Sequence, residues 1–231
     1  MVALCAMVPL YLVIAALTRG ALTRGRTVHV PALPLDDLLP LWPPAALVYG
    51  ALYLFLIVLP VVVIRRAEHL DRVFRAWLLL WGTSYLCFLL WPTVAPRPEG
   101  VPAGGFGAWS LAALYRADPP FNCLPSIHVG HSFVSALACW PVHRGVGVVA
   151  VIAASLVAAS TLLAKQHYVA DLCAGLALAV VAYRITVHRF ASTGIPAEER
   201  AAAPVMTALA AGLSAVTLGV FWIAWRSGVQ L

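Results

Sequence analysis

Residues 145–187, GVGVVAVIAASLVAASTLLAKQHYVADLCAGLALAVVAYRITV, decide the fold class of this chain. They contain two apolar runs, 145–164 and 169–187, on either side of a polar turn, 165–167. Each run has about the 20 apolar residues with which a helix crosses the hydrocarbon core of a bilayer. Because no segment alternates long enough for a membrane barrel, the sequence predicts an all-α integral membrane protein.

The same apolar pattern recurs along the whole chain. We expect spans at residues 2–17, 45–64, 73–91, 125–141, 145–164, 169–187 and 204–225. The first run is short and lacks the features of a signal peptide, so the bundle has six or seven transmembrane helices. We expect one membrane domain, 1–231, with a catalytic core at 91–187 and an accessory C-terminal span within 192–231.

The composition supports a membrane location. The chain is 62% hydrophobic and 10% charged, whereas a soluble domain has about 25% charged residues. This excludes a soluble enzyme, a disulfide scaffold and a disordered chain. The net charge is +6, but 14 of the 15 cations are arginines scattered through short connections. This pattern is typical of loops that flank a membrane, and we expect no nucleic-acid partner.

Basic segments predict the orientation of the bundle. Residues 65–72, 142–144 and 184–200 follow the second, fourth and sixth spans, and the positive-inside rule places all three in the cytoplasm. The long segment 92–124 and the turn 165–167 then lie on the outer face of a multi-pass cell-membrane protein. One group of arginines does not fit the positive-inside rule in this orientation. It follows the first span and would lie on the outer face, and it consists of Arg19, Arg24 and Arg26.

Three polar groups fall on that predicted outer face, where ionisable residues at span ends indicate function. The first is Arg97, which lies between Pro96 and Pro98. Proline restricts the backbone on both sides, and a guanidinium held in this way can bind phosphate with two parallel hydrogen bonds. The alternative is an interfacial arginine near lipid headgroups.

The second group opens the fourth span. Pro125 and Ser126 form a helix-start signal, and a helix N-terminus offers free N–H groups and partial positive charge to phosphate oxygens. Ser126 adds a hydroxyl donor. His128, one turn further, can carry a proton near neutral pH. His131 shares that face, and we interpret it as a histidine bonded inside the bundle.

The third group opens the sixth span. His167 and Asp171 are four residues apart and therefore meet on one face of a helix. A carboxylate bonded to one imidazole nitrogen leaves the other free to attack, which predicts His167 as a nucleophile. Lys165, the only lysine, precedes this pair, although snorkelling would also explain an interfacial lysine.

These residues resemble the three signature motifs of the type 2 phosphatidic acid phosphatase superfamily, K-x6-R-P, P-S-G-H and S-R-x5-H-x3-D. Arg97 with Pro98 matches the first, the segment 125–128 the second, and Ser160 with His167 and Asp171 the third. This sequence departs from the motifs at three positions, with Leu90 in place of lysine, Ile127 in place of glycine and Thr161 in place of arginine. With these departures, the chain resembles the branch of the superfamily that contains the inositolphosphoryl-ceramide synthases and related inositolphosphotransferases.

The resemblance implies a metal-free mechanism that needs no cofactor. Arg97, Lys165 and Ser126 would hold the phosphoryl oxygens. Lys165 would replace one of the two missing cations, and Arg116 is a weaker candidate for the other. His167, oriented by Asp171, would form a phosphohistidine, while His128 would act as acid and then base. The implied substrate is a lipid phosphate or diphosphate in the bilayer.

Several alternatives stay open at this point. The two histidines and Asp171 could ligate zinc, although nearby cations would repel it. Transfer to inositol or another alcohol differs from hydrolysis only in the acceptor. Asp36 and Asp37 could recognise acceptor hydroxyls or merely cap a helix. A non-enzymatic transporter component is a distant alternative. Transporter sites lie near the bilayer centre, whereas the ionisable residues of this chain cluster near one interface.

Overall fold

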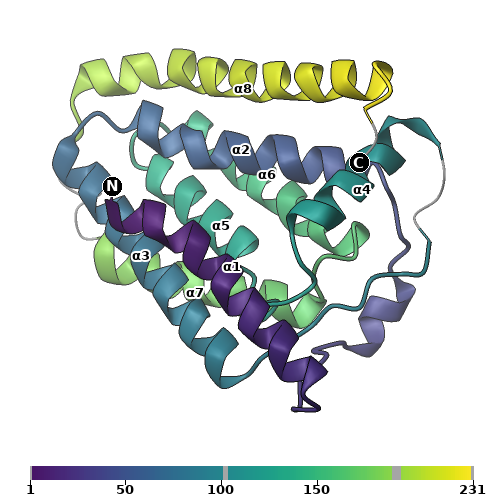
Figure 1. Ribbon diagram of the computed structural model, residues 1–231. Helices are drawn as coiled ribbons and strands as arrows, with labels where there is room; N and C mark the ends of the chain where they lie inside the picture. Colours follow the sequence, from purple (N-terminus) through teal and green to yellow (C-terminus); the bar gives the residue numbers. More distant parts are fainter. Residues whose placement is uncertain (1, 101–103, 189–193, 230–231) are drawn as a thin grey trace.

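The computed structural model describes residues 2–100, 104–188 and 194–229. Residues 101–103 of the expected outer loop, 189–193 of the third basic segment and 230–231 of the C-terminal region lie outside the described residues. All the named elements of the described part are helices (Figure 1). Its elements are α1 (Val2–Thr23), η1 (Pro34–Leu38), α2 (Ala45–Val63), α3 (Ala67–Leu90), α4 (Gly105–Ala117), α5 (Ile127–Cys139), α6 (Arg144–Leu163), α7 (Val169–Thr186) and α8 (Ala197–Arg226).

Six of the described helices are long and apolar enough to cross a membrane, namely α1, α2, α3, α6, α7 and α8. This confirms the predicted all-α membrane bundle. Helix α5 has 13 residues and extends about 20 Å, less than the hydrocarbon core of about 30 Å. Ten of its residues are buried, so neighbouring helices, rather than lipid, surround it.

The structure has helix in several segments that the sequence predicted as connections, and α1 also extends beyond its expected end, to Thr23. Helix α3 begins at Ala67, so most of the expected basic turn is helical, because Glu68–Arg72 and Asp71–Arg75 form ion pairs one turn apart. Helix α8 begins at Ala197, with two acidic residues in its first turn, where the helix dipole favours negative charge. The expected outer loop contains α4, because Leu111 is fully buried against the start of α2.

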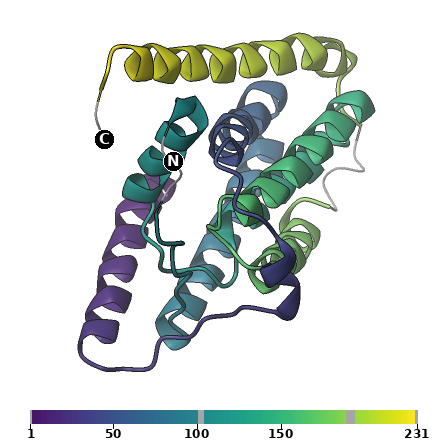
Figure 2. The same cartoon turned by 90° about the vertical axis from the view of Figure 1, so that its right-hand side faces the viewer.

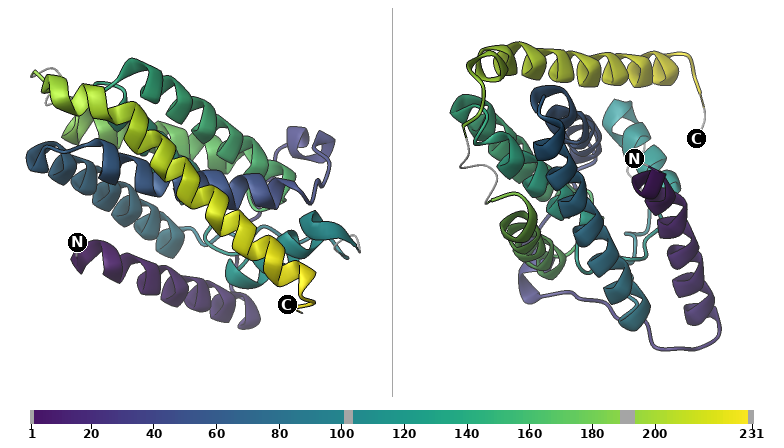
Figure 3. Two further views of the ribbon diagram at one scale, coloured as in Figure 1. Left: turned by 90° about the horizontal axis from the view of Figure 1, so that it is seen from above. Right: turned by 90° about the vertical axis from the view of Figure 1, so that its left-hand side faces the viewer.

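The core lies where α2, α3, α5 and α6 pack around one another. Leu56, Leu80, Val134 and Val157 come from these four helices and are all 0% exposed. Helix α8 lies across α2 on the outside of the bundle, as Figures 1 and 2 show. Figure 3 shows α1 beside α3 on the opposite side. The peripheral helices α1 and α8 therefore cover a compact group of inner helices.

The connections gather at two ends of the bundle. In Figure 1, α2, α5 and α7 begin at the end of the helix that lies further to the right, and α3 and α6 end there. At the other end, Arg65 N–H donates to Glu199 Oε1 (3.2 Å), Arg66 to the Gly194 carbonyl (3.3 Å) and Arg72 to the Thr186 carbonyl (3.3 Å). Described residues of the first and third basic segments thus share one end, opposite the three polar groups.

Helices α5 and α7 meet through their backbones. Gly175 on α7 lies so close to α5 that a Cβ there would collide with the Ser126 carbonyl oxygen. Nearby, the Ser126 N–H donates to the Asp171 carbonyl at 3.0 Å. Because backbone atoms cannot rotate away as a side chain can, glycine is required at residue 175.

We predict that Gly175→Ala lowers the stability of the bundle by about 1–3 kcal/mol, because the added methyl group pushes α5 away from α7. The matched control is Gly212→Ala on α8, where a Cβ would meet no atom within 4 Å. That control should be neutral or slightly stabilising, since alanine favours helix. Thermal unfolding of both variants in one detergent measures the difference, and equal melting temperatures would contradict this account.

Candidate active site

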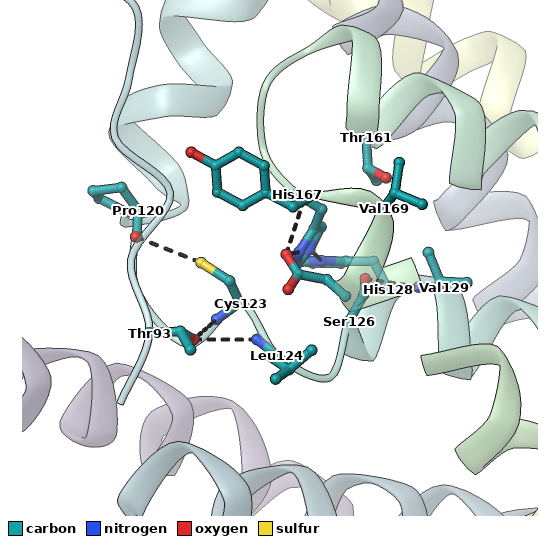
Figure 4. A network of polar contacts seen from close by, with 12 residues as sticks. Thr93, Pro120, Cys123, Leu124, Ser126, His128, Val129, Thr161, His167 and Val169 are labelled. Atoms are coloured by element: carbon teal, nitrogen blue, oxygen red, sulfur yellow. Dashed lines mark hydrogen bonds and ion pairs between the residues drawn. The ribbon is translucent and has the colours of Figure 1, made fainter. Parts of the chain in front are cut away.

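Two histidines and one aspartate form a continuous line at the start of α5 and α7. His167 Nδ1–H donates to Asp171 Oδ2 at 3.2 Å, and the Tyr168 N–H donates to the same oxygen at 2.9 Å. His167 Nε2 lies 3.3 Å from His128 Nδ1 (Figure 4). Since a carboxylate only accepts, the proton of neutral His167 is on Nδ1, and Nε2 carries a lone pair.

The contact between His167 and Asp171 is present as their spacing predicts, but not on a helix face. Helix α7 begins at Val169, so His167 lies in the turn before it and Asp171 in its first turn. Both side chains are buried, with exposures of 7% and 0%. Burial in the bundle protects this pair from water and strengthens its electrostatic coupling.

The turn that carries His167 is held by backbone hydrogen bonds. The amides of Gln166 and His167 both donate to the Thr161 carbonyl, at 2.9 and 3.3 Å. Lys165 adopts a left-handed conformation with φ of 52°, which is uncommon for a residue with a Cβ. The motif position that Thr161 occupies therefore contributes through its backbone.

Lys165 reaches from this turn towards η1. Its Nζ donates to the carbonyls of Leu39 (2.6 Å) and Asp36 (3.2 Å). Lys165 and His167 both border a small cavity of about 30 Å³, which has room for only a few water molecules. The ammonium charge thus lies beside the turn of the candidate nucleophile.

Arg97 joins three separate segments near the same turn. Its Nη1 donates to the Lys165 carbonyl (3.2 Å), and its Nη2 donates to the Asp118 carbonyl (2.9 Å). Its guanidinium stacks 4.2 Å from the centre of the Tyr115 ring, and the Tyr115 hydroxyl donates to the Ala164 carbonyl (2.8 Å). Burial lowers the pKa of Arg97 and the charge of Asp118 opposes this, so the guanidinium stays protonated.

Ser126 caps α5 immediately before His128. Its Oγ accepts from the Val129 N–H at 3.3 Å, which leaves the hydroxyl proton available as a donor. The preceding loop is anchored by Thr93, whose Oγ1 accepts from the amides of Cys123 (2.9 Å) and Leu124 (3.2 Å), as Figure 4 shows. This anchoring positions the helix start and its free N–H groups beside the histidines.

The three accessory candidates have different surroundings. Asp36 is buried, and its carboxylate accepts from the amides of Val169 (2.9 Å) and Leu33 (2.8 Å), so it caps both α7 and η1. Asp37 is exposed. Arg116 borders, with Arg19, a separate cavity of about 280 Å³ whose lining contains neither His128 nor His167. The structure therefore groups Asp36 with the site and leaves Arg116 apart.

Aromatic residues around His128 were not anticipated from the sequence. Tyr49 and Tyr53 on α2 approach the His128 ring edge-on, with ring centroids 5.1 and 4.9 Å away. Their spacing of four residues places them on one face of α2, which is the only signal that the sequence offers. The sequence also did not indicate Asp118 as a residue near the site. Its carboxylate accepts a hydrogen bond from the Tyr11 hydroxyl at 2.7 Å.

His128 also borders a large apolar cavity between α1, α2, α3 and α5. Its volume is about 520 Å³. Six aromatic side chains line it, namely Tyr11, Tyr53, Phe74, Trp77, Trp81 and Tyr85. A cavity of this size and lining accommodates a hydrophobic ligand.

Other chemistries have less support at this site. Among the described residues, no group of three or more His, Cys, Asp or Glu side chains is arranged to hold a metal ion. Burial raises the pKa of the nearby Cys123 thiol, which therefore stays protonated and is a poor nucleophile.

The fold and the site define a multi-span helical membrane protein with two histidines and an aspartate joined at one end of the bundle. A family model described as the PAP2 superfamily matches residues 39–185, and the chain belongs to that superfamily. Membership indicates phosphatase or phosphotransferase activity. No curated protein and no solved structure gives a significant match.

We predict that Asp36→Ala lowers the stability by about 1–3 kcal/mol, because the amides of Val169 and Leu33 lose their acceptor. The adjacent Asp37→Ala is the control, since Asp37 is exposed. Thermal unfolding in detergent gives the comparison. If both variants unfold at the wild-type temperature, the capping role of Asp36 is wrong.

Proposed function

We propose that this protein is a membrane lipid phosphatase that removes phosphate from a lipid phosphate or diphosphate through a phosphohistidine intermediate. The observation that carries this proposal is the line from Asp171 through His167 to His128. One imidazole nitrogen of His167 is bonded to a carboxylate, and the other carries a lone pair that faces a second histidine. This is the arrangement of a nucleophile with an orienting carboxylate and a neighbouring acid.

The first half-reaction breaks the bond between phosphorus and the lipid oxygen. His167 Nε2 attacks phosphorus, while His128, which enters this step as the imidazolium with a proton on each ring nitrogen, gives its Nδ1 proton to the departing lipid oxygen. Because the two nitrogens are now 3.3 Å apart, the rings must separate to admit the phosphoryl group between them. The products of this step are the lipid alcohol, a phosphohistidine and a neutral His128 ready to accept a proton.

The second half-reaction releases phosphate. A water molecule gives a proton to His128 and attacks phosphorus, the P–N bond breaks, and His167 regains its lone pair. Asp171 keeps the His167 ring in one tautomer through both steps. The fixed charges of Arg97 and Lys165, the Ser126 hydroxyl and the first amides of α5 would stabilise the negative charge of the transferring group.

The surroundings of the site favour a lipid as the substrate. His128 borders the apolar cavity of about 520 Å³ and also faces the polar end of the bundle. A lipid phosphate could therefore place its chain among aromatic side chains and its phosphate between the histidines. The basic residues at the opposite end support a cytoplasmic location for that end, and we place the site at the extracytoplasmic face of the cell membrane.

We predict that His167→Ala lowers turnover of a lipid phosphate at least about a thousand-fold, because no covalent intermediate can form. The control is His188→Ala, an exposed histidine beyond the far end of α7, which should keep wild-type turnover. Rapid quenching with a phosphorus-labelled substrate should trap an acid-labile label on the wild-type protein and on His188→Ala, but not on His167→Ala. Retained turnover in His167→Ala would exclude the phosphohistidine route.

A second candidate function is transfer of the phosphoryl group to inositol or another alcohol. It is favoured by the departures at Leu90, Ile127 and Thr161 from the phosphatase motifs. Hydrolysis needs no binding site for an acceptor, and the carboxylate of Asp36 is already occupied by two amides. We therefore prefer the phosphatase.

We predict that the purified protein releases free phosphate from lipid phosphates in vesicles at the same rate with and without inositol. Phosphate release and phosphorylated polyol should be measured in the same samples by chromatography. A phosphorylated polyol that forms at the expense of free phosphate would replace hydrolysis by transfer as the function.

A further inference from the structure

The apolar cavity beside His128 extends into the membrane-spanning part of the bundle. Tyr53, Ile57 and Val61 line it at intervals of four residues along α2, so they form one face about 12 Å long. Tyr53 lies next to His128, and Val61 lies near the opposite end of α2. The cavity is therefore elongated along the helices, with the catalytic histidine near one end.

His131 borders the same cavity one helical turn beyond His128. Its side chain is only 4% exposed, and its ring stacks on Trp77 with centroids 4.4 Å apart. The Trp81 indole N–H donates to its Nδ1 at 3.3 Å. Because an indole nitrogen only donates, Nδ1 is unprotonated and the proton of the imidazole is on Nε2.

That Nε2–H group has no hydrogen-bond partner among the described residues. A buried donor without an acceptor is unfavourable, and most buried polar groups in proteins are paired. The other cavity-lining residues of α2, α3 and α5 are mostly apolar or aromatic. A ligand that enters the cavity can therefore supply an acceptor for His131.

We propose that His131 Nε2–H binds an oxygen of the lipid substrate that lies close to the phosphorylated carbon. The proposal rests on the phosphatase function above and specifies its substrate class. His131 lies three residues after His128, which is a rise of about 4–5 Å along the helix axis. A lipid oxygen a few covalent bonds from the phosphate ester lies at this distance from the phosphate. The preferred substrate is therefore a phosphate of an acylglycerol or acylamino alcohol, whose carbonyl or hydroxyl lies at this distance. A polyprenyl or alkyl monophosphate has no such oxygen.

The test compares two substrates with the same chain, 1-oleoylglycerol 3-phosphate and oleyl phosphate. For the wild-type protein in mixed micelles, we expect kcat/KM to be about 3- to 10-fold higher for the acylglycerol phosphate, the effect of one neutral hydrogen bond. His131→Phe keeps an aromatic ring but no N–H, and should lose this preference because kcat/KM falls more for the acylglycerol phosphate than for oleyl phosphate. His131→Gln restores a donor and should recover part of the preference.

Binding of both lipids to the His167→Ala protein, measured by calorimetry, separates this proposal from the phosphatase function. We expect the same 3- to 10-fold preference in affinity, and substitution of His131 by Phe in that background should abolish it. If the wild type hydrolyses neither lipid but this binding preference is present, the phosphatase function fails and the role of His131 stands.

Two results would overturn the role of His131. One is an equal kcat/KM for the two lipids in the wild-type protein together with an equal affinity for them in His167→Ala. Both proteins retain His131, so this result does not depend on whether a His131 variant folds. The other is an equal loss on both lipids in a folded His131→Phe protein, which would show that His131 only supports packing.

Discussion

The site depends on the close backbone contact between α5 and α7. Gly175 allows the two helices to approach until the Ser126 N–H reaches the Asp171 carbonyl at 3.0 Å. This contact brings the first turn of α5, with His128, against the turn that carries His167. A larger side chain at residue 175 would push α5 away from α7 and would therefore separate the two histidines.

A polar site inside an apolar bundle must also satisfy its own backbone groups, because buried carbonyls and amides lack water. Here cations perform this role. Arg97 binds the carbonyls of Lys165 and Asp118, and Lys165 binds those of Asp36 and Leu39. In the proposed function, the same two positive charges that hold the turn in place would also stabilise a phosphate beside it.

The parts of the site that the sequence predicts are local. The spacing of His167 and Asp171 and the capping position of Ser126 involve residues at most four apart, and their contacts are present in the structure. The start of the expected fourth span was predicted well, because Pro125 and Ser126 mark the start of α5, but the expectation that this segment spans the membrane was wrong, because α5 has only 13 residues. The helix α4 was missed, because its short apolar pattern is stabilised by packing against α2 and not by its own length.

The sequence by itself determined the membrane location, the helical class and the identity of the polar groups at the span ends, because hydrophobicity, helix periodicity and capping act over short distances. Tertiary structure alone decided which groups meet. It paired Lys165 with a carbonyl 129 residues away, turned Asp36 into a helix cap and left the His131 N–H, beside an apolar cavity, without a partner in the part of the chain that the structure describes. Such contacts depend on how whole helices pack, and packing depends on shapes that become defined only when the chain is folded.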